Sequence, residues 1–183
     1  MAGKIQDRLK LHWELHRWGY FWNTVFAFAI VVSVLAWQTR HVPSGLVPNL
    51  PMQVLKDGRI ESTSLHRWRA EHPGTPVALH FWADWCPNCR TEQHSVTRLA
   101  KDWPVLTVAM QSGTADNVNA VLEKRQLPWE TVIDQNGEIT RSHGFHAVPA
   151  FMVVDSNGIM RASTVGYTTE LGMRLRLWWA ENF

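Results

Sequence analysis

The feature that most constrains this chain is the pattern of a buried strand that leads directly into a pair of cysteines. Residues 77–82 are apolar at nearly every position, which is typical of a strand covered on both faces of a sheet. Cys86, Pro87, Asn88 and Cys89 follow, and the two cysteines are the only ones in the 183 residues. The stretch after them has helical spacing, so the sequence predicts a dithiol where a strand gives way to a helix.

A dithiol in this position is suited to disulfide exchange. The unpaired N–H groups and the dipole at a helix N-terminus favour a thiolate at Cys86. Cys89 lies one turn further along the helix and is placed to attack a mixed disulfide, so we predict that Cys86 attacks and Cys89 resolves. The competing interpretation is half of a zinc site, which needs two further ligands, and the chain has no second pair of cysteines.

Composition narrows the class of protein further. With 45% hydrophobic and 19% charged residues, the chain is typical of a globular domain, and two cysteines are too few for a disulfide scaffold. The formal net charge is +2 and there is no long basic block, which argues against a nucleic-acid partner. We expect no cofactor and no resident metal.

Residues 18–39 predict a membrane anchor, because they contain no Asp, Glu, Lys, Arg or His. At about 1.5 Å rise per residue this stretch can cross a hydrocarbon core of about 30 Å. Tryptophans lie at both of its ends, where amphipathic rings prefer to sit. Lysines and arginines are frequent in residues 1–17, whereas only Arg40 follows closely, so we expect residues 1–17 in the cytoplasm and the rest outside the inner membrane.

Two other interpretations of this stretch stay open. A signal peptide cleaved after Ala36 would fit the small-residue pattern, although the apolar stretch is longer than usual and a tryptophan would follow the cut. A buried core helix is the other, and the absence of a polar face argues against it.

The rest of the chain alternates strands and helices. Residues 40–50 are predicted to be a linker because they contain Pro43, Gly45 and Pro48, and residues 51–183 then form the domain. This order predicts an α/β fold with a mixed sheet covered on both faces. The expected strands are a hairpin over 53–60 and the segments 77–82, 105–110, 131–134, 150–155 and 159–165; the expected helices are 64–71, 87–103, 116–125, 138–143 and 169–181.

Residues 81–90 and 144–158 resemble the thioredoxin superfamily. The resemblance covers residues 50–183 and implies a thioredoxin-like fold with a mixed central sheet and helices on both faces. It also implies that the Val148–Pro149 bond is cis and faces the dithiol, with the Val148 backbone pairing with a substrate strand. From the residues alone, a proline at the start of a strand is the alternative.

The helix and strand expected between residues 101 and 134, and the run from Cys89 to Glu92, resemble the membrane-tethered TlpA-like branch. Within it, the chain is most similar to members linked to suppression of copper sensitivity. The resemblance implies a periplasmic oxidoreductase for protein thiols and disulfides, with a membrane thiol carrier as electron donor and a role in copper tolerance. A reductase for cytochrome c maturation, or a copper-binding module without turnover, are the alternatives.

The remaining candidate residues surround the dithiol. Trp85 is expected to be an exposed ring beside the thiol, and Pro87 and Asn88 to contact substrate with it. Glu92, one turn after Cys89, is either a proton carrier for that thiol or a solvated helix acid.

Two histidines and the dipeptide between the cysteines leave further alternatives. His143 and His146 could approach Cys86 and bind copper with it, or be surface histidines. The Pro-Asn dipeptide between the cysteines influences the reduction potential, so the direction of electron flow stays open.

Overall fold

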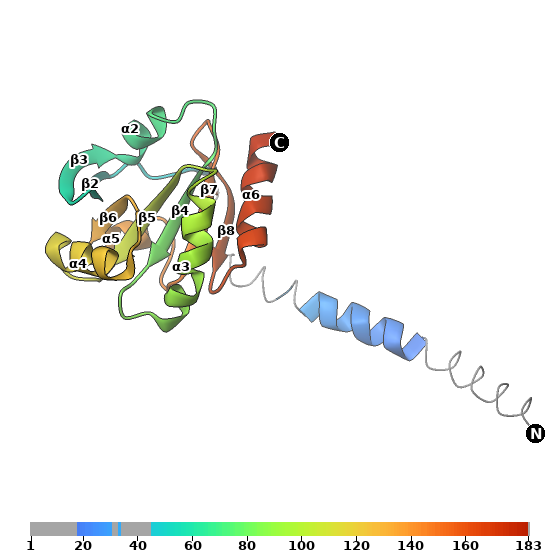
Figure 1. Cartoon of the computed structure of the whole chain (residues 1–183). Helices are drawn as coiled ribbons and strands as arrows, with labels where there is room; N and C mark the ends of the chain where they lie inside the picture. The colour runs from blue at the N-terminus through green and yellow to red at the C-terminus, as the bar shows by residue number, and fades with distance from the viewer. Residues whose placement is uncertain (1–17, 31–32, 34–44, 183) are drawn as a thin grey trace, which may run out of the picture. The chain divides into compact units, whose positions relative to one another are not determined.

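The computed structural model describes residues 18–30, 33 and 45–182. The chain divides into two units, Met1–Arg40 and His41–Phe183. In the first unit, residues 18–30 are helical (Figure 1). Within the described residues, no helix is both long enough and apolar enough to cross a membrane. Part of the predicted anchor, residues 31–32 and 34–39, lies outside the described residues, as do residues 1–17.

The second unit is built on one mixed sheet of eight strands in the order β1-β8-β7-β4-β5-β6-β2-β3 (Figure 1). β4 and β6 pair with β5 in parallel, and all other neighbours are antiparallel. This confirms the predicted α/β class and mixed sheet. The strands are β1 (Gly45–Leu46), β2 (Pro51–Lys56), β3 (Arg59–Ser64), β4 (Val77–Trp82), β5 (Val105–Met110), β6 (Thr131–Asp134), β7 (Ala150–Val154) and β8 (Ile159–Val165).

Helices cover both faces of this sheet, because its central strands are apolar on both sides. In β4, Ala78 and Trp82 belong to one hydrophobic cluster, whereas Val77, Leu79 and Phe81 belong to the other. Apolar residues of α3, α4 and α6 join the first cluster, and those of α2 and α5 join the second. The helices are α2 (Leu65–Ala70), α3 (Pro87–Leu99), α4 (Ala115–Arg125), α5 (Glu138–Ser142) and α6 (Glu170–Asn182).

The folded unit begins before residue 51, where the sequence placed a linker. Gly45 and Leu46 form β1 and pair with Met160 and Ile159 of β8. Val47 is buried, and its N–H donates to the Gly158 carbonyl at 3.0 Å. Residues 45–47 therefore belong to the sheet and its core rather than to a linker. The sequence did not reveal this strand, because two residues carry too little periodicity to be recognised.

Two helix ends differ from the prediction. α3 ends at Leu99 rather than at residue 103, because Pro104 disfavours helical backbone in the residue before it. α4 begins at Ala115 rather than at residue 116 and is capped by Thr114: the Thr114 hydroxyl accepts the Asn117 N–H, and the Asn117 side chain accepts the Thr114 N–H in return.

Candidate active site

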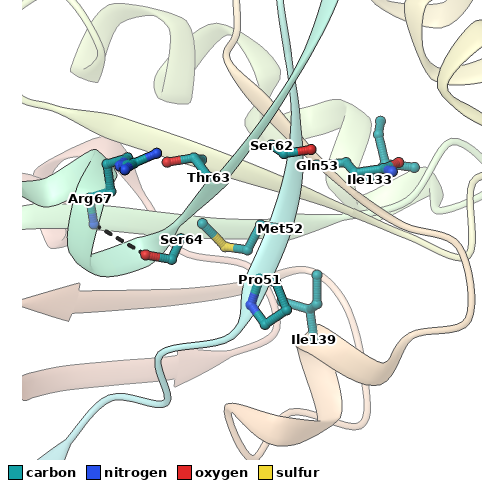
Figure 2. Close-up of a pocket in the computed structure, with 9 residues that line it drawn as sticks. All are labelled: Pro51, Met52, Gln53, Ser62, Thr63, Ser64, Arg67, Ile133 and Ile139. Atoms are coloured by element: carbon teal, nitrogen blue, oxygen red, sulfur yellow. Dashed lines mark hydrogen bonds between the residues drawn. The ribbon is translucent and has the colours of Figure 1, made fainter.

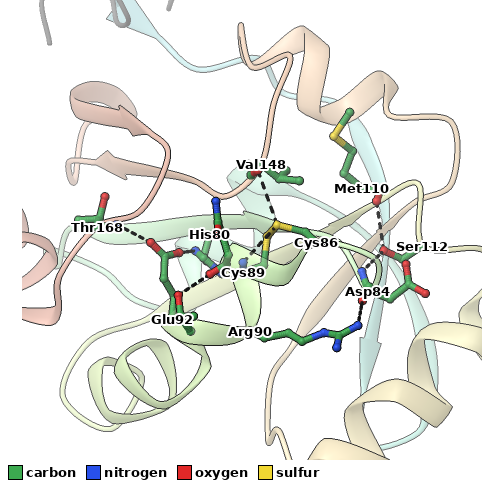
Figure 3. The surroundings of a disulfide bond; sticks show 12 residues. His80, Asp84, Cys86, Cys89, Arg90, Glu92, Met110, Ser112, Val148 and Thr168 are labelled. Atoms are coloured by element: carbon green, nitrogen blue, oxygen red, sulfur yellow. Dashed lines mark hydrogen bonds and ion pairs between the residues drawn. A yellow bond between two sulfur atoms is a disulfide. The ribbon is translucent and has the colours of Figure 1, made fainter. Parts of the chain in front are cut away.

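The dithiol lies at the N-terminus of α3, just beyond the end of β4. Cys86 is the N-cap residue, Pro87 occupies the first turn, and the Cys89 N–H donates to Cys86 Sγ at 3.1 Å. The two cysteines are joined in a disulfide (Figure 3). Only 3% of Cys86 and 1% of Cys89 is exposed, so the fold places both sulfurs below the surface.

The loop that precedes β7 closes over Cys86. The Val148–Pro149 peptide is cis, as the resemblance implies, and the Val148 carbonyl oxygen lies 3.7 Å from Cys86 Sγ (Figure 3). The loop is close because β7 pairs antiparallel with β4, with Phe81 opposite Ala150. The two sequence segments that carry the resemblance therefore meet at one site.

The rim of the site is formed by exposed residues. Trp85 is 56% exposed, and its indole N–H donates to the Gln111 carbonyl at 3.1 Å. Pro87 and Asn88 are exposed beside it. The structure thus exposes three of the four residues predicted to contact substrate around the disulfide, and it places the fourth, Val148, against Cys86.

Polar contacts from the loop after β5, from α3 and from α4 hold the segment before Cys86. The Asp84 N–H donates to Ser112 Oγ at 3.1 Å, and the Asp84 carbonyl accepts from Arg90 at 3.4 Å and from Arg125 at 3.0 Å. Two guanidinium groups therefore converge on the Asp84 carbonyl, two residues before Cys86. Sequence reasoning missed Ser112 and Arg125, because nothing in their own segments signals that the fold brings them to Asp84.

Glu92 is buried, so the alternative of a solvated helix acid is wrong. It lies on the same face of α3 as Cys89, Val96 and Leu99, all of them buried. Its carboxylate accepts the Thr168 N–H (Figure 3). Burial raises the pKa of Glu92 to about 7, although the Thr168 hydrogen bond opposes this shift.

His80 is a second buried ionisable residue behind the dithiol, and sequence reasoning did not single it out. It lies in β4, it is fully buried, and neither ring nitrogen has a hydrogen-bond partner. Its Nδ1 is 3.9 Å from Glu92 Oε2. Burial lowers the pKa of His80 to about 3, so its ring is neutral at physiological pH. The available signal was a histidine inside an apolar strand that leads to the cysteines.

The two histidines considered as copper ligands do not form a metal site with Cys86. His143 is buried against Phe81, with ring centroids 5.7 Å apart, and its Nδ1 lies 2.7 Å from the Ile139 carbonyl. His146 is exposed. The prediction of surface histidines therefore fits His146 and is wrong for His143. In the part of the chain that the structure describes, no group of three or more His, Cys, Asp or Glu residues could hold a metal ion.

A pocket elsewhere in the domain shares no residue with the dithiol site. Residues of the β2–β3 hairpin line it, together with Arg67, Ile133 and Ile139 (Figure 2). The hydrogen bond from the Arg67 N–H to Ser64 Oγ at 3.3 Å, shown in Figure 2, is the N-cap interaction of α2. The pocket therefore adds nothing to the chemistry of the cysteines.

A helix-capping disulfide faced by a cis-proline loop on a mixed sheet defines a thioredoxin-like thiol-disulfide oxidoreductase. Comparison with known proteins agrees: the chain belongs to the AhpC/TSA family, which it matches over residues 47–163. A relative from Haemophilus influenzae, named thioredoxin-like protein, is 30% identical over 85% of this chain and 90% of its own length. The thiol:disulfide interchange protein DsbE of Pseudomonas aeruginosa is 24% identical over 75% of this chain and 76% of its own length.

Solved structures share the fold. StoA from Bacillus subtilis matches with a TM-score of 0.57 and 20% identity, over 75% of this chain and 99% of its own. A secreted thiol-disulfide isomerase from Corynebacterium glutamicum matches with a TM-score of 0.63 and 15% identity, over 75% of this chain and 86% of its own. At these identities the likeness supports the thioredoxin-like fold.

Proposed function

We propose that this protein exchanges disulfides with other proteins, with Cys86 as the attacking thiol and Cys89 as the resolving thiol. The Cys86 thiolate attacks a partner disulfide, and the second partner sulfur leaves as a thiolate and takes up a proton. Cys89 then attacks Cys86 Sγ, the Cys86–Cys89 bond forms, and the partner leaves with both its sulfurs reduced. The same steps in reverse oxidise a partner dithiol.

The observation that carries this proposal is the position of Cys86 relative to α3. Burial does not separate the two cysteines, because both are nearly inaccessible in the disulfide. The helix N-terminus does: Cys86 Sγ is the cap that accepts a backbone N–H, whereas Cys89 lies within the helix. A thiolate is therefore stabilised at Cys86 and not at Cys89.

The rim and the loop before β7 supply a place for an extended partner segment. Trp85, Pro87 and Asn88 offer exposed contact surface, and the Val148 peptide lies against Cys86. An extended segment that paired with the Val148 backbone would bring its own sulfur to Cys86, as in strand addition to other peptide-binding domains. Pro149 fixes the direction of that backbone.

Glu92 is the proton acceptor in this proposal. It follows Cys89 by one helical turn on the same buried face, and a carboxyl with a pKa of about 7 can take up and release a proton near neutral pH. The Cys89 thiol passes its proton to the carboxylate as its sulfur attacks the mixed disulfide.

We also propose that the domain is tethered to the inner membrane by residues 18–39 and works in the periplasm, with a membrane thiol carrier as electron donor. The apolar, uncharged stretch and the basic residues before it support the tether. Relatives named thiol:disulfide interchange proteins support the reaction class. A role in copper tolerance follows from the family resemblance alone, and growth of a deletion strain with and without added copper tests it.

Capture of partners tests the exchange steps directly. In Cys89→Ala the resolving thiol is missing, so partner proteins should stay covalently bound through Cys86 and be released by dithiothreitol. Cys86→Ala is the matched control and should capture none. Equal capture by the two variants would contradict the proposed roles.

The direction of electron flow is assigned by the reduction potential of the Cys86–Cys89 couple. A value near about −270 mV marks a reductant of partner disulfides, and one near about −120 mV marks an oxidant. The measurement needs only equilibration with glutathione buffers and alkylation of the free thiols.

A further inference from the structure

His80 is a buried polar residue behind the dithiol, and the proposed exchange steps give it no role. His80 occupies the middle of β4, and its side chain lies on the face that α3 covers, between those of Ala78 and Trp82. Both of its ring nitrogens lack hydrogen-bond partners. Leaving a buried polar group unpaired costs about 1–3 kcal/mol, so an apolar residue would be the more stable choice at this position.

The neighbour that His80 faces is Glu92. Its Nδ1 lies 3.9 Å from Glu92 Oε2, and the other carboxylate oxygen accepts the Thr168 N–H (Figure 3). The distance to Nδ1 exceeds a normal hydrogen bond by less than 1 Å, so a small movement closes it. Glu92 is thus held from one side by a backbone donor and faced on the other by a free ring nitrogen.

The other groups around His80 carry no charge that competes with Glu92. The Thr107 hydroxyl of β5 is hydrogen-bonded to Thr131 Oγ1 at 2.7 Å. The Trp129 ring packs edge-on against the His80 ring, with the ring centroids 6.1 Å apart. Phe151 of β7 lies opposite His80 in the sheet, and α6 contributes Met173 and Leu177 to the same cluster. Three charged residues of α6 are engaged elsewhere, Arg176 with Gly172 O, Glu170 with Arg98 and Arg174, and Arg174 with Asp102, and the fourth, Glu181, is exposed.

We propose that His80 is a positioning residue for Glu92: its neutral ring donates an Nδ1 hydrogen to the carboxylate when Glu92 is ionised and ready to accept the proton of Cys89. This inference rests on the proposed exchange reaction and on the role of Glu92 in it. A hydrogen bond to an ionised group is about twice as strong as one between neutral groups. The ring therefore stabilises the carboxylate more than the protonated acid, and it counteracts the burial that favours the protonated acid.

The proton balance of the resolving step is then complete within the domain. The Cys89 S–H bond breaks as the Cys89 sulfur bonds to Cys86 Sγ, and the proton moves to Glu92. The bond from Cys86 to the partner sulfur breaks, and the partner leaves as a thiolate that is protonated by water. His80 gains and loses no proton in this sequence; it holds the base in its ionised form.

The two-step reaction of the reduced protein with Ellman's reagent tests this role. Attack by Cys86 releases the first coloured thiolate, and resolution by Cys89 releases the second, so stopped-flow absorbance separates the two steps. In the wild type the second step should accelerate through an apparent pKa near that of Glu92. Leucine is close to histidine in volume. His80→Leu should slow the second step about tenfold at pH 7 and move the pH profile of this step to higher pH, while the rate of the first step stays unchanged.

Three further single variants and one double variant make the result specific. His80→Asn carries an amide N–H where Nδ1 lies and should restore most of the wild-type profile. Glu92→Gln should remove the inflection near the pKa of Glu92 from the pH profile of the second step, and His80→Leu should then have no further effect in the double variant. His143→Leu removes a buried histidine from the opposite face and should leave the second step unchanged.

Distinct outcomes overturn the inference and the reaction on which it rests. If His80→Leu and the wild type share one pH profile, or if His80→Leu slows the second step equally in the Glu92→Gln background, His80 is a packing residue and the inference is wrong. If Glu92→Gln itself keeps the wild-type profile, the proposed role of Glu92 fails first. Should His80→Leu not fold, a His80→Asn variant that resolves the mixed disulfide more slowly than the wild type, with its pH profile moved to higher pH, still contradicts the proposal.

Discussion

At the scale of single residues, the site combines two ionisable side chains, Glu92 and His80, whose pKa values burial shifts in opposite directions. Burial raises the pKa of Glu92 to about 7 and lowers the pKa of His80 to about 3, so both side chains are neutral between about pH 3 and pH 7. Neither side chain can be explained by stability, because an apolar pair would pack without unpaired polar atoms. Both are explained if Glu92 handles the proton of Cys89.

The raised pKa of Glu92 predicts a pH dependence of stability. The unfolded chain loses this proton near pH 4.5 and the folded protein near 7, so the folded state binds more protons in between, and the unfolding free energy falls as pH rises through that window. The lowered pKa of His80 acts with the opposite sign between about pH 3 and 6.5 and masks part of the effect. The wild type alone therefore cannot separate the two groups.

Glu92→Gln isolates the contribution of the carboxyl. The unfolding free energy of the wild type minus that of the variant should fall by about 3 kcal/mol between pH 4.5 and 8, measured by urea denaturation of the oxidised proteins. Glu181→Gln, an exposed acid of α6, is the control and should show a flat difference. If the difference in unfolding free energy between the wild type and Glu92→Gln also stays constant with pH, the Glu92 carboxyl of the folded wild type is ionised over the whole range.

At the scale of elements, α4 is tied to the segment before the dithiol by its last residue. Arg125 donates to the Asp84 carbonyl at 3.0 Å, and Arg90 reaches the same oxygen from α3 at 3.4 Å. The helix between β5 and β6 therefore takes part in shaping the site.

Arg125→Met should lower the unfolding free energy, measured by urea denaturation, by about 1–2 kcal/mol because a charged donor to a partly buried carbonyl is lost. Lys124→Met is the matched control: it removes the same charge from the neighbouring exposed position without touching Asp84. Equal effects of the two substitutions would show that the contact with Asp84 contributes nothing.

The sequence revealed those parts of the fold that depend on local patterns. The strand over residues 77–82 and the hairpin turn at Asp57 and Gly58 are visible because burial on both faces and turn chemistry leave a signature within a few residues. The cysteine pair and the cis peptide at Pro149 were predicted from a motif and from its resemblance to a family.

What stayed hidden depends on contacts between distant segments. β1 becomes a strand only by pairing with β8, about 110 residues later in the chain. Glu92 looked equally like a surface acid because the Thr168 N–H that accompanies its burial lies 76 residues away in sequence. Arg125 approaches Asp84 only through the packing of α4, so no local pattern indicated it.

At the scale of the whole molecule, a thioredoxin-like domain follows an N-terminal stretch whose composition predicts a membrane tether. A tether would confine the dithiol to the membrane surface, where a membrane thiol carrier is accessible, and would keep it among proteins outside the cytoplasm. The Trp residues at the ends of residues 18–39 and the basic residues before them predict the orientation.

A reporter enzyme that is active only outside the cytoplasm tests this topology. Fused after Phe183, it should be active, and fused after Arg17, before the apolar stretch, it should be inactive. A stable but inactive fusion after Phe183 would contradict the proposed orientation. A mature protein that begins at Trp37 would show that the stretch is a cleaved signal peptide.

The division of labour between the two cysteines is the central claim, and the order of alkylation of the reduced protein tests it most directly. Brief exposure to limiting iodoacetamide, followed by a heavy-isotope reagent after unfolding, reports by mass spectrometry which thiol reacted first. The account predicts that the first label is found mostly on Cys86, because its sulfur caps α3 and accepts the Cys89 N–H. Labelling of Cys89 as fast as Cys86, or faster, would contradict it.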